Sequence, residues 1–375
     1  MGSTLTVDNI KDSGDNTLVS STGSGYKITA GEISGSKINL SGTAPSSPVT
    51  GDMYYNSSVN ALMIYNGTIW HSIYSHVNGE IEIYTSGSTT YAVHTFRDSS
   101  TFTMNATKTC NILIVGGGGG GGSGGDNSGS NGMAGGGAGG FVFYNNKSIS
   151  AGSHNIRVGR GGTSNGGEDH GGGSNPMAGN AGACSGGNSK FGSLQIAIGG
   201  GGSPGGNNSP GYDGGSGSGG NCDSGGIGKG YTNQGNNGGT PGAGSVGWCA
   251  GGGGGAKLVG KNYNDSSGYG YGGDGYTEGE TVYDHNTGSN VTFNINDKGT
   301  AFAGGGAGGR WDRTDTSIGG VGGGGSGGIK FETDLLDGTP YTGGGGAGYS
   351  SGSGYTWGFH GGTGGSGIII IRYAI

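Results

Sequence analysis

The residues of this chain that could do proton-transfer or metal chemistry are few and scattered. Its seven histidines show no ligand spacing, and the one close acid–histidine cluster, Glu168 to His170, lies in a glycine-rich stretch. Such a cluster is typical of a solvated loop, and the alternative is a metal or receptor contact. The 24 acidic residues show no pattern that pairs two of them for glycosidic cleavage. We therefore predict no enzyme activity, no cofactor and no metal. The alternative is a depolymerase whose acids meet only in the fold.

Aromatic side chains offer a second kind of chemistry, which is recognition by contact. Tyrosine supplies contact area at low entropic cost while Ser, Gly and Asn adapt their hydrogen bonds, and this is the composition of antibody paratopes. Segments 349–360 and 263–276 are the best candidates for an exposed recognition tip. The candidate receptor-binding residues are Tyr349, Tyr355, Trp357, Phe359, His360, Tyr263, Tyr269, Tyr271, Tyr276 and Trp311. The alternative role for such rings is to cap glycine tracts and shield their backbone.

These loops need a scaffold, and the sequence provides one by joining short strands to glycine tracts. The apolar run from Ile112 to Val115 is typical of a buried strand, and the uninterrupted glycine run from Gly116 to Gly122 follows it directly. Glycine tracts can adopt the left-handed polyproline II geometry (polyglycine II), with three residues per turn and no internal hydrogen bonds. Because they lack side chains, several tracts can pack closely and satisfy their backbone groups by lateral hydrogen bonds. We expect such a bundle to form the core.

The same alternation of strands and glycine tracts continues to the end of the chain. Strands are predicted at 80–84, 91–96, 100–104, 139–144, 148–158, 193–198, 291–295 and 367–373. Glycine tracts lie between them at 199–202, 251–255, 304–306, 322–325 and 343–346. The absence of a strict Gly-X-Y period and the presence of only seven prolines exclude collagen. Since no helical period follows Val115, a dinucleotide-binding turn is not predicted either.

Charge and composition restrict the partners. The formal net charge of −7 and the pI near 5.4 provide no basic surface for phosphate, so we expect no nucleic acid partner. No apolar run approaches the roughly 20 residues of a membrane-spanning helix, so we expect no membrane insertion. The N-terminus lacks the regions of a signal peptide, which predicts synthesis in a cytoplasm without cleaved export. The four cysteines favour free thiols, with one bridge among Cys184, Cys222 and Cys249 as the alternative.

The first 77 residues differ from the rest, because glycine is ordinary there and short polar–apolar alternations dominate. Strands are predicted at 4–10, 26–29 and 37–40, and a three-stranded meander at 51–56, 61–65 and 68–73. Asn66-Gly67 between two apolar runs is a strong hairpin signal. We therefore predict a β-rich module at 1–77 and a second, glycine-rich domain at 78–375.

Two blocks in the first module resemble segments found near the start of bacteriophage tail-fibre and related virion proteins. The first runs from Leu5 to Ser13, and the second runs from Gly51 to Asn56 and continues from Tyr65 to Trp70. In such proteins the N-terminal region attaches to the particle or builds a trimeric shaft. The resemblance implies that role for residues 1–77, with other virion tail proteins as partners and a homotrimer as the assembly.

The rest of the chain resembles a glycine-rich domain family found in phage fibre-tip adhesins and, more distantly, in the extracellular part of anaplastic lymphoma kinase receptors. Four blocks agree in order: the glycines after Val115, Gly137 to Val142, Gly152 to Gly162, and Gly364 to Tyr373. The resemblance implies a jelly-roll-like β-sandwich that carries a bundle of polyglycine II helices. An aromatic-rich insertion at about 207–298 departs from the family pattern, and its shape stays open.

Together these observations predict an all-β protein of a virion tail fibre, made in the host cytoplasm. Its expected function is that of a receptor-binding adhesin that recognises the host bacterial surface, through a glycan or an outer-membrane protein. The alternative is a structural virion or filament protein that uses polyglycine packing without receptor binding. An ice-binding protein is a third hypothesis, but the loop aromatics and the virion-like N-terminal blocks count against it.

Overall fold

The structure, a computed structural model, is all-β among the residues that it describes. These are residues 9–11, 17–21, 26–28, 41–72, 78–123, 132–164, 184–204, 210–222, 225–242, 249–263, 269–309, 317–327, 336–349 and 360–375. The chain divides into two compact units, Met1–Gly42 and Thr43–Ile375. In the first unit, β1 (Asn9–Lys11), β2 (Thr17–Ser21) and β3 (Tyr26–Ile28) form an antiparallel sheet in sequence order.

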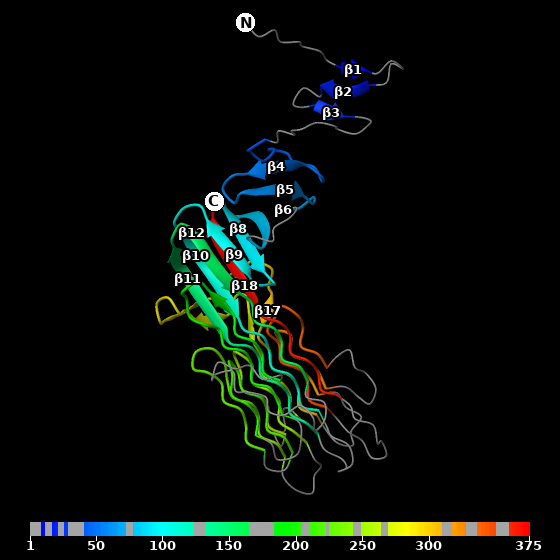
Figure 1. Cartoon of the computed structure of the whole chain (residues 1–375), viewed down its shortest axis with the longest axis vertical. Coiled ribbons are helices and arrows are strands. Elements are labelled where there is room, and N and C mark those ends of the chain that lie inside the picture. Colours follow the sequence, from blue (N-terminus) through cyan, green and yellow to red (C-terminus); the bar gives the residue numbers. More distant parts are fainter. Residues whose placement is uncertain are drawn as a thin grey trace. The chain divides into compact units, whose positions relative to one another are not determined.

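The second unit is built on one antiparallel sheet of eight strands (Figure 1). Its strands are β4 (Met53–Asn56), β5 (Ala61–Tyr65), β6 (Trp70–Ser72), β7 (Glu80–Ser86), β8 (Thr89–Phe96), β10 (Lys108–Val115), β11 (Phe141–Ile149) and β18 (Ile368–Ala374). They lie in the order β11-β10-β18-β8-β7-β6-β5-β4. The C-terminal strand β18 therefore lies between β10 and β8, two strands that come more than 250 residues earlier in the sequence.

The predicted meander is present as β4 to β6, but it belongs to this same sheet. Trp70 of β6 is paired with Ile83 of β7, so hydrogen bonding runs across the predicted division between residues 77 and 78. The compact units instead divide after Gly42. The physical reason is that the free edge of the meander finds its partner in β7, since an edge strand presents unpaired N–H and C=O groups.

Alternate residues of the central strands pack into two different cores. Ile112 and Ile114 of β10 face one cluster, which includes Phe102 and Phe191 of a second sheet. That sheet is formed by β13 (Lys190–Phe191), β12 (Gly152–Arg157) and β9 (Ser100–Met104), in this order. The two sheets form a β-sandwich, and the period-2 alternation of a strand explains the division.

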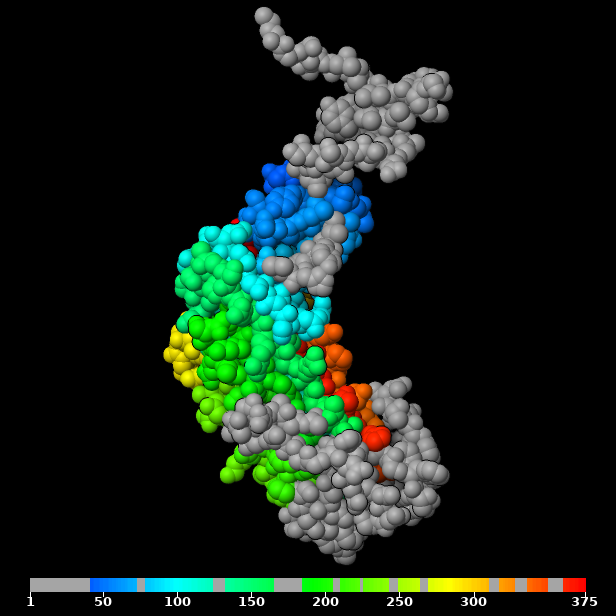
Figure 2. Space-filling model, viewed as in Figure 1, coloured from blue at the N-terminus to red at the C-terminus, as the bar shows by residue number. Residues whose placement is uncertain are grey.

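The second face of the large sheet is covered by the aromatic-rich insertion and by the residues directly after it, up to Ala303. Leu113 and Val115 of β10 pack there with Phe293 and Phe302. This cover contains two hairpin-like pairs, β14 (Tyr276–Thr277) with β17 (Ala301–Phe302) and β15 (Thr281–Tyr283) with β16 (Asn290–Thr292). The β15–β16 pair lies beside β11, where Phe143 and Asp284 form an isolated bridge (Figure 2, yellow beside green). Because both faces of β10 are buried, its apolar run is continuous.

Glycine tracts continue from the ends of the central strands as a lattice (Figure 1). The tract Gly116–Gly122 is at its centre, and its N–H groups donate to three different tracts in strict rotation. Gly116, Gly119 and Gly122 donate to Gly140, Gly137 and Ala134; Gly117 and Gly120 donate to Gly187 and Cys184; Gly118 and Gly121 donate to Gly365 and Gly362. The period is three residues, as polyglycine II geometry requires.

The carbonyl groups of the central tract accept from three further tracts. Gly117 and Gly120 accept from Gly200 and Ser203, Gly118 accepts from Gly162, and Gly119 and Gly122 accept from Gly346 and Tyr349. The central tract is thus surrounded on all sides, and its backbone is satisfied laterally. Tracts of the insertion also join this lattice: Gly254 donates to Gly217, and Gly253 donates to Gly306.

Close packing of backbones explains why these positions are glycine. A Cβ atom on Gly118 would lie 2.0 Å from the Gly344 carbonyl oxygen, and one on Gly121 would lie 1.9 Å from that of Ala347. Small side chains are tolerated only where the lattice leaves room, as at the buried Ala138. The four cysteines are buried thiols and not disulfides, as the favoured interpretation of the sequence predicts.

The predicted strand at 193–198 does not form as such. Gly192 turns the chain with φ of +51°. Within 193–198, Ala197 forms an isolated antiparallel β-bridge with Ser189. The Gln234 side chain takes the place of a strand partner: its amide donates to the Ile196 carbonyl (2.8 Å) and accepts from Ile198 N–H (2.9 Å). A side chain from far along the chain thus satisfies backbone that the sequence pattern assigns to a sheet.

A buried histidine fastens the C-terminal strand to the sandwich. His94 Nδ1 lies 2.8 Å from the Asn78 carbonyl oxygen, and its Nε2 lies 2.9 Å from the Tyr373 hydroxyl. Because a carbonyl only accepts, Nδ1 carries the proton and Nε2 accepts from Tyr373. The imidazole is therefore held neutral between β8 and β18, and burial lowers its pKa to about 4.

Lowering the pH from 7 to 5 is expected to reduce the free energy of unfolding by about 2 kcal/mol through His94. The unfolded histidine ionises near 6.5 and the folded one near 4. As the pH falls, the unfolded state therefore binds the proton before the folded state does. The contribution of neutral His94 to the free energy of unfolding is fully present above pH 6.5 and is lost as the pH falls toward 4. Urea denaturation at both pH values measures the loss. The His94→Gln variant should lose clearly less, and an equal loss in both proteins contradicts the assignment.

Candidate functional site

The structure describes six of the ten candidate receptor-binding residues. These are Tyr263, Tyr269, Tyr271, Tyr276, Tyr349 and His360. The remaining candidates, Trp311, Tyr355, Trp357 and Phe359, lie outside the described residues, as does the cluster from Glu168 to His170. The described candidates do not form one group, because some are buried by packing and others lie near the ends of glycine tracts.

Two of the tyrosines pack against the scaffold. Tyr263 is only 6% exposed, and its ring lies so close to Gly242 that a Cβ there would be 2.2 Å from ring carbon Cδ1. The Tyr276 ring lies 5.1 Å from that of Phe141, and burial raises the pKa of Tyr276. These two rings cover glycine backbone and a strand. This is the shielding role that is the alternative to receptor binding for such residues.

The other described candidates are more accessible. Tyr269 is 38% exposed and His360 is exposed, while Tyr271 and Tyr349 are partly buried. Burial raises the pKa of Tyr349, whose N–H donates to the Gly122 carbonyl (3.0 Å). Its backbone is therefore part of the lattice, and its position is fixed by the central tract.

The lattice brings together tract ends that are far apart in sequence. Gly309 N–H donates to the Met133 carbonyl (2.7 Å), and Met133 N–H donates to the Tyr349 carbonyl (2.9 Å). Gly361 N–H donates to Ser123 Oγ (2.9 Å). On the neighbouring tracts, Ala250 N–H donates to Gly309 and Gly308 N–H to Gly270. We call the following residues the tract-end cluster: Ser123, Met133, Ala250, Gly270, Gly309, Tyr349 and Gly361.

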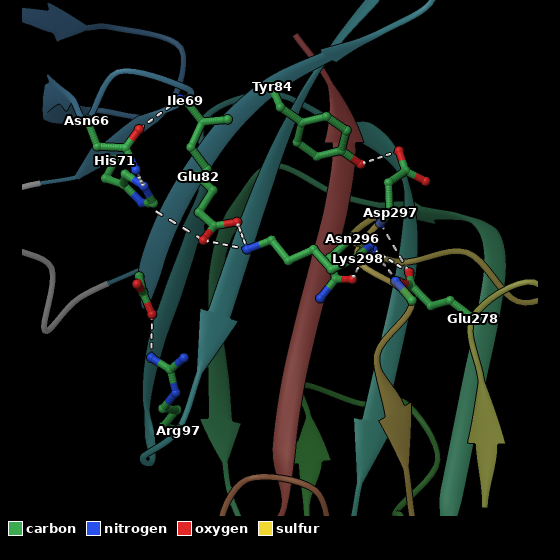
Figure 3. Close-up of polar contacts among 12 residues, drawn as sticks. Asn66, Ile69, His71, Glu82, Tyr84, Arg97, Glu278, Asn296, Asp297 and Lys298 are labelled. Atoms are coloured by element: carbon green, nitrogen blue, oxygen red, sulfur yellow. Dashed lines mark hydrogen bonds and ion pairs between the residues drawn. The ribbon is translucent and has the colours of Figure 1, made fainter. Parts of the chain in front are cut away.

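A polar seam fixes the insertion to the second face of the large sheet (Figure 3). Lys298 Nζ lies 2.7 and 2.5 Å from the two carboxylate oxygens of Glu82. The Tyr84 hydroxyl donates to Asp297 Oδ2 (2.8 Å), which also accepts from Arg372 Nη2 (3.2 Å). Burial is the main cause that raises the pKa of Tyr84. Tyr84 therefore remains a hydrogen-bond donor at neutral pH.

One carboxylate of the insertion shapes the loop that carries these partners. Glu278 accepts backbone N–H bonds from Ile295 and Asn296, each at 2.7 Å, through Oε1. Its Oε2 accepts from Lys298 and Gly299, each at 2.9 Å. A carboxylate that gathers several N–H groups makes a rigid turn, since charge-assisted hydrogen bonds are strong. Its role is thus to present Asp297 and Lys298 to the sheet.

His71, Glu80 and Glu82 lie close enough to be considered as metal ligands, since their ligand atoms are within 4.8 Å of one another. The hydrogen bonds argue for an ion-pair network instead. Asn66 Oδ1 accepts from Thr68 N–H, so its amide group donates to His71 Nε2 (2.7 Å). His71 Nδ1, 3.9 Å from Glu82, then carries the proton and is no ligand.

Both carboxylates of this group also have cationic partners. Glu82 binds Lys298, and Glu80 binds Arg97 in an exposed ion pair. The group therefore contributes to the seam that joins the sheet to the insertion, and its chemistry is that of a structural contact.

A groove of 430 Å³ lies between β11, the turn after β13, and His285 of the insertion. The polar or charged side chains at its walls include Tyr144, Lys147, His154 and His285. No sequence pattern predicts this site, because its residues come from separate segments with no shared spacing. The one signal was the alternation of polar and apolar residues in 141–149, which indicates a strand but no ligand.

Among the described residues, no helix is long and apolar enough to span a bilayer. No curated protein matches the chain. The profile of a family described as "Glycine-rich domain" matches residues 94–374, which is well over half of the chain. By this match, and in agreement with its lattice of glycine tracts, the chain belongs to the glycine-rich domain family.

Proposed function

We propose that this protein is the receptor-binding adhesin of a bacteriophage tail fibre. The observation that carries the proposal is the tract-end cluster. Segments 310–316 and 350–359 follow directly on two of its members, Gly309 and Tyr349. A backbone lattice that holds the residues preceding these two segments is suited to recognition, because binding residues gain from a rigid support.

The composition of these segments supports recognition by contact and not catalysis. Segment 350–359 combines Tyr355, Trp357 and Phe359 with serine and glycine, and segment 310–316 contains Trp311. Aromatic rings beside small polar residues supply contact area and adaptable hydrogen bonds. The proposed partner is a glycan or an outer-membrane protein of the host surface, and the proposed location is the tail fibre of the virion. Attachment to other tail proteins and trimerisation are assigned to the N-terminal region by its sequence resemblance.

One observation favours the alternative of a structural virion or filament protein. Leu258, Val259, Ile318 and Val321 are exposed by 40 to 54%. They lie on tracts that flank residues 272–275: Leu258 donates to Asp274, and Gly272 and Gly275 donate to Ile318 and Val321. Exposed aliphatic side chains grouped on neighbouring tracts are typical of association surfaces. In this alternative the lattice serves assembly alone.

Replacing Tyr355, Trp357 and Phe359 together by serine is expected to reduce binding to host cells at least tenfold, because buried aromatic anchors carry most of the energy of such interfaces. The fluorescently labelled protein is measured by cytometry on a panel of bacterial isolates. Tyr231→Ser is the matched control, since Tyr231 is 39% exposed and lies outside the tract-end cluster.

Two outcomes would count against the proposal. Equal labelling by the triple variant and the wild type would exclude segment 350–359 as the recognition surface. A lack of labelling across a panel with a susceptible host, together with stable self-association in sedimentation, would favour the structural alternative.

A further inference from the structure

The groove beside β11 lies on the sandwich, and none of its lining residues belongs to the tract-end cluster. Its apolar lining residues are Ile149, Phe191 and Leu194. Phe191 and Ile149 are also members of the sandwich core, which holds this part of the lining in place. The remaining lining residues come from β11 and the turn after it, β12, the Gly192–Gln195 turn and the insertion, and most of them are polar. A concave site in which polar groups converge beside apolar side chains is a usual form of a small-ligand site.

Two histidines that line this groove carry acceptor nitrogens. His285 Nδ1 lies 3.3 Å from the Phe143 carbonyl, so Nδ1 carries the proton and Nε2 is an acceptor. That Nε2 is buried and has no hydrogen-bond partner. His154 Nε2 donates to the Ser150 carbonyl (2.9 Å), which makes its Nδ1 the second acceptor. Leaving a buried polar atom unsatisfied costs about 1–3 kcal/mol, so a donor that reached His285 Nε2 would be favoured.

Donors are provided by two residues of β11. The Tyr144 hydroxyl oxygen accepts from Gln195 N–H (3.0 Å), which leaves its own hydrogen available for donation. Lys147 adds a positive charge, and its Nζ lies 3.3 Å from Asn286 Oδ1 and 5.8 Å from the Tyr144 ring centre. Donors and acceptors that converge on one groove match a ligand with many hydroxyl groups, because each hydroxyl both donates and accepts.

The charge of the groove selects the kind of hydroxyl-rich ligand. No carboxylate lines it, and the nearby carboxylate of Asp284 is occupied. Asp284 accepts from Asn145 N–H, Asn286 N–H and the Thr287 hydroxyl. Burial by itself would raise the pKa of Asp284, but these hydrogen bonds outweigh it and lower the pKa. Lys147 is therefore free of a carboxylate partner among the lining groups.

We propose that this groove binds an acidic saccharide unit, with hydroxyl groups at His154, His285 and Tyr144 and its anionic group at Lys147. The inference rests on the proposed function in one respect, since an adhesin would meet such sugars in bacterial surface polysaccharides. It adds a second contact region, on the sandwich and not at the tract ends.

The test uses the full chain on an immobilised array of acidic and neutral oligosaccharides. The acidic set contains oligosaccharides of glucuronate with N-acetylglucosamine and purified acidic capsular fragments, and the neutral set contains N-acetylglucosamine oligomers. The wild type is expected to bind members of the acidic set at least tenfold more strongly than the neutral set. Lys147→Gln is expected to reduce that binding at least tenfold, and Ser193→Trp should block it by filling the groove.

Lys229→Gln is the matched control, since it removes a lysine that is exposed and does not line the groove. Lack of binding to the acidic set, or equal binding by Lys147→Gln and the wild type, overturns the inference. Cell labelling that persists in Lys147→Gln and Ser193→Trp but is lost in the triple aromatic variant leaves the adhesin proposal standing and rejects the groove alone. Binding to acidic sugars without labelling of any cell supports the groove and rejects the adhesin.

Discussion

Replacing Gly121 by alanine is expected to prevent stable folding of the glycine-rich domain. The new Cβ atom would lie 1.9 Å from the Ala347 carbonyl oxygen, and that oxygen is itself held by Gly362 N–H (2.8 Å). The collision is with backbone, which cannot turn away as a flexible side chain would. Overpacking in cores typically costs 1–3 kcal/mol, and here we expect on the order of 4 kcal/mol or more, because the central tract is enclosed by neighbours. Soluble yield and urea denaturation measure the effect.

Gly226→Ala provides a matched control in the same domain. Gly226 is exposed, its φ is not positive, and an added Cβ would meet only Pro210 Cβ at 3.5 Å, an ordinary contact. Removing a glycine at such a site reduces the entropy of the unfolded chain and stabilises proteins by about 0.4–1 kcal/mol. If both variants unfolded at the urea concentration of the wild type, the lattice would not be what holds the domain together.

Replacing Arg372 by methionine is expected to lower the free energy of unfolding by about 3 kcal/mol, because removing one partner of a buried ion pair leaves the others unsatisfied. Arg372 is 7% exposed and contacts Asp297 and Asn294 by its two terminal nitrogens. Its guanidinium also lies 3.9 Å from the Tyr91 ring centre. Loss of these guanidinium contacts would weaken the attachment of the insertion to the sheet. Urea denaturation followed by tryptophan fluorescence measures it.

Arg97→Met is the control for the loss of an arginine. Its pair with Glu80 is exposed at both side chains, and such pairs contribute about 0–1 kcal/mol. Arg372→Lys should remain destabilised, because an ammonium group cannot match the fork geometry or stack on Tyr91. Equal stability of the Arg372→Met and Arg97→Met variants would show that the seam does not fasten the insertion.

The local elements of the fold were predictable from particular residues. The run from Ile112 to Val115 predicts a strand that ends at Gly116, and β10 ends at Val115. The terminal run from Ile368 likewise predicts β18. Both signals are strong because a strand buried on both faces needs a continuous apolar run, and glycine stops it abruptly. The lateral bonding of Gly116–Gly122 was predictable too, since polyglycine II helices have no internal hydrogen bonds and satisfy their backbone groups laterally.

The positions of the aromatic residues and of the groove needed the tertiary structure. Tyr263 and Tyr276 belong to the same tyrosine-rich stretch as the exposed Tyr269, yet they pack against Gly242 and Phe141. The groove is lined by Tyr144 of β11 and by His285 of the insertion, and no spacing in the sequence relates these two residues. In both cases burial depends on which tract lies alongside, and the local pattern does not contain that information.

The sequence by itself thus determined the family of elements: short strands, glycine tracts and loops rich in aromatic residues. Only the tertiary structure decided which tracts are neighbours, for example that Gly117 bonds to Gly187 and Gly118 to Gly365. The physical reason is that glycine tracts are alike in shape and hydrogen bonding, so no side chain on them specifies a partner. Their order is set instead by the strands at their ends, as β10 and β18 fix Val115 opposite Ile368.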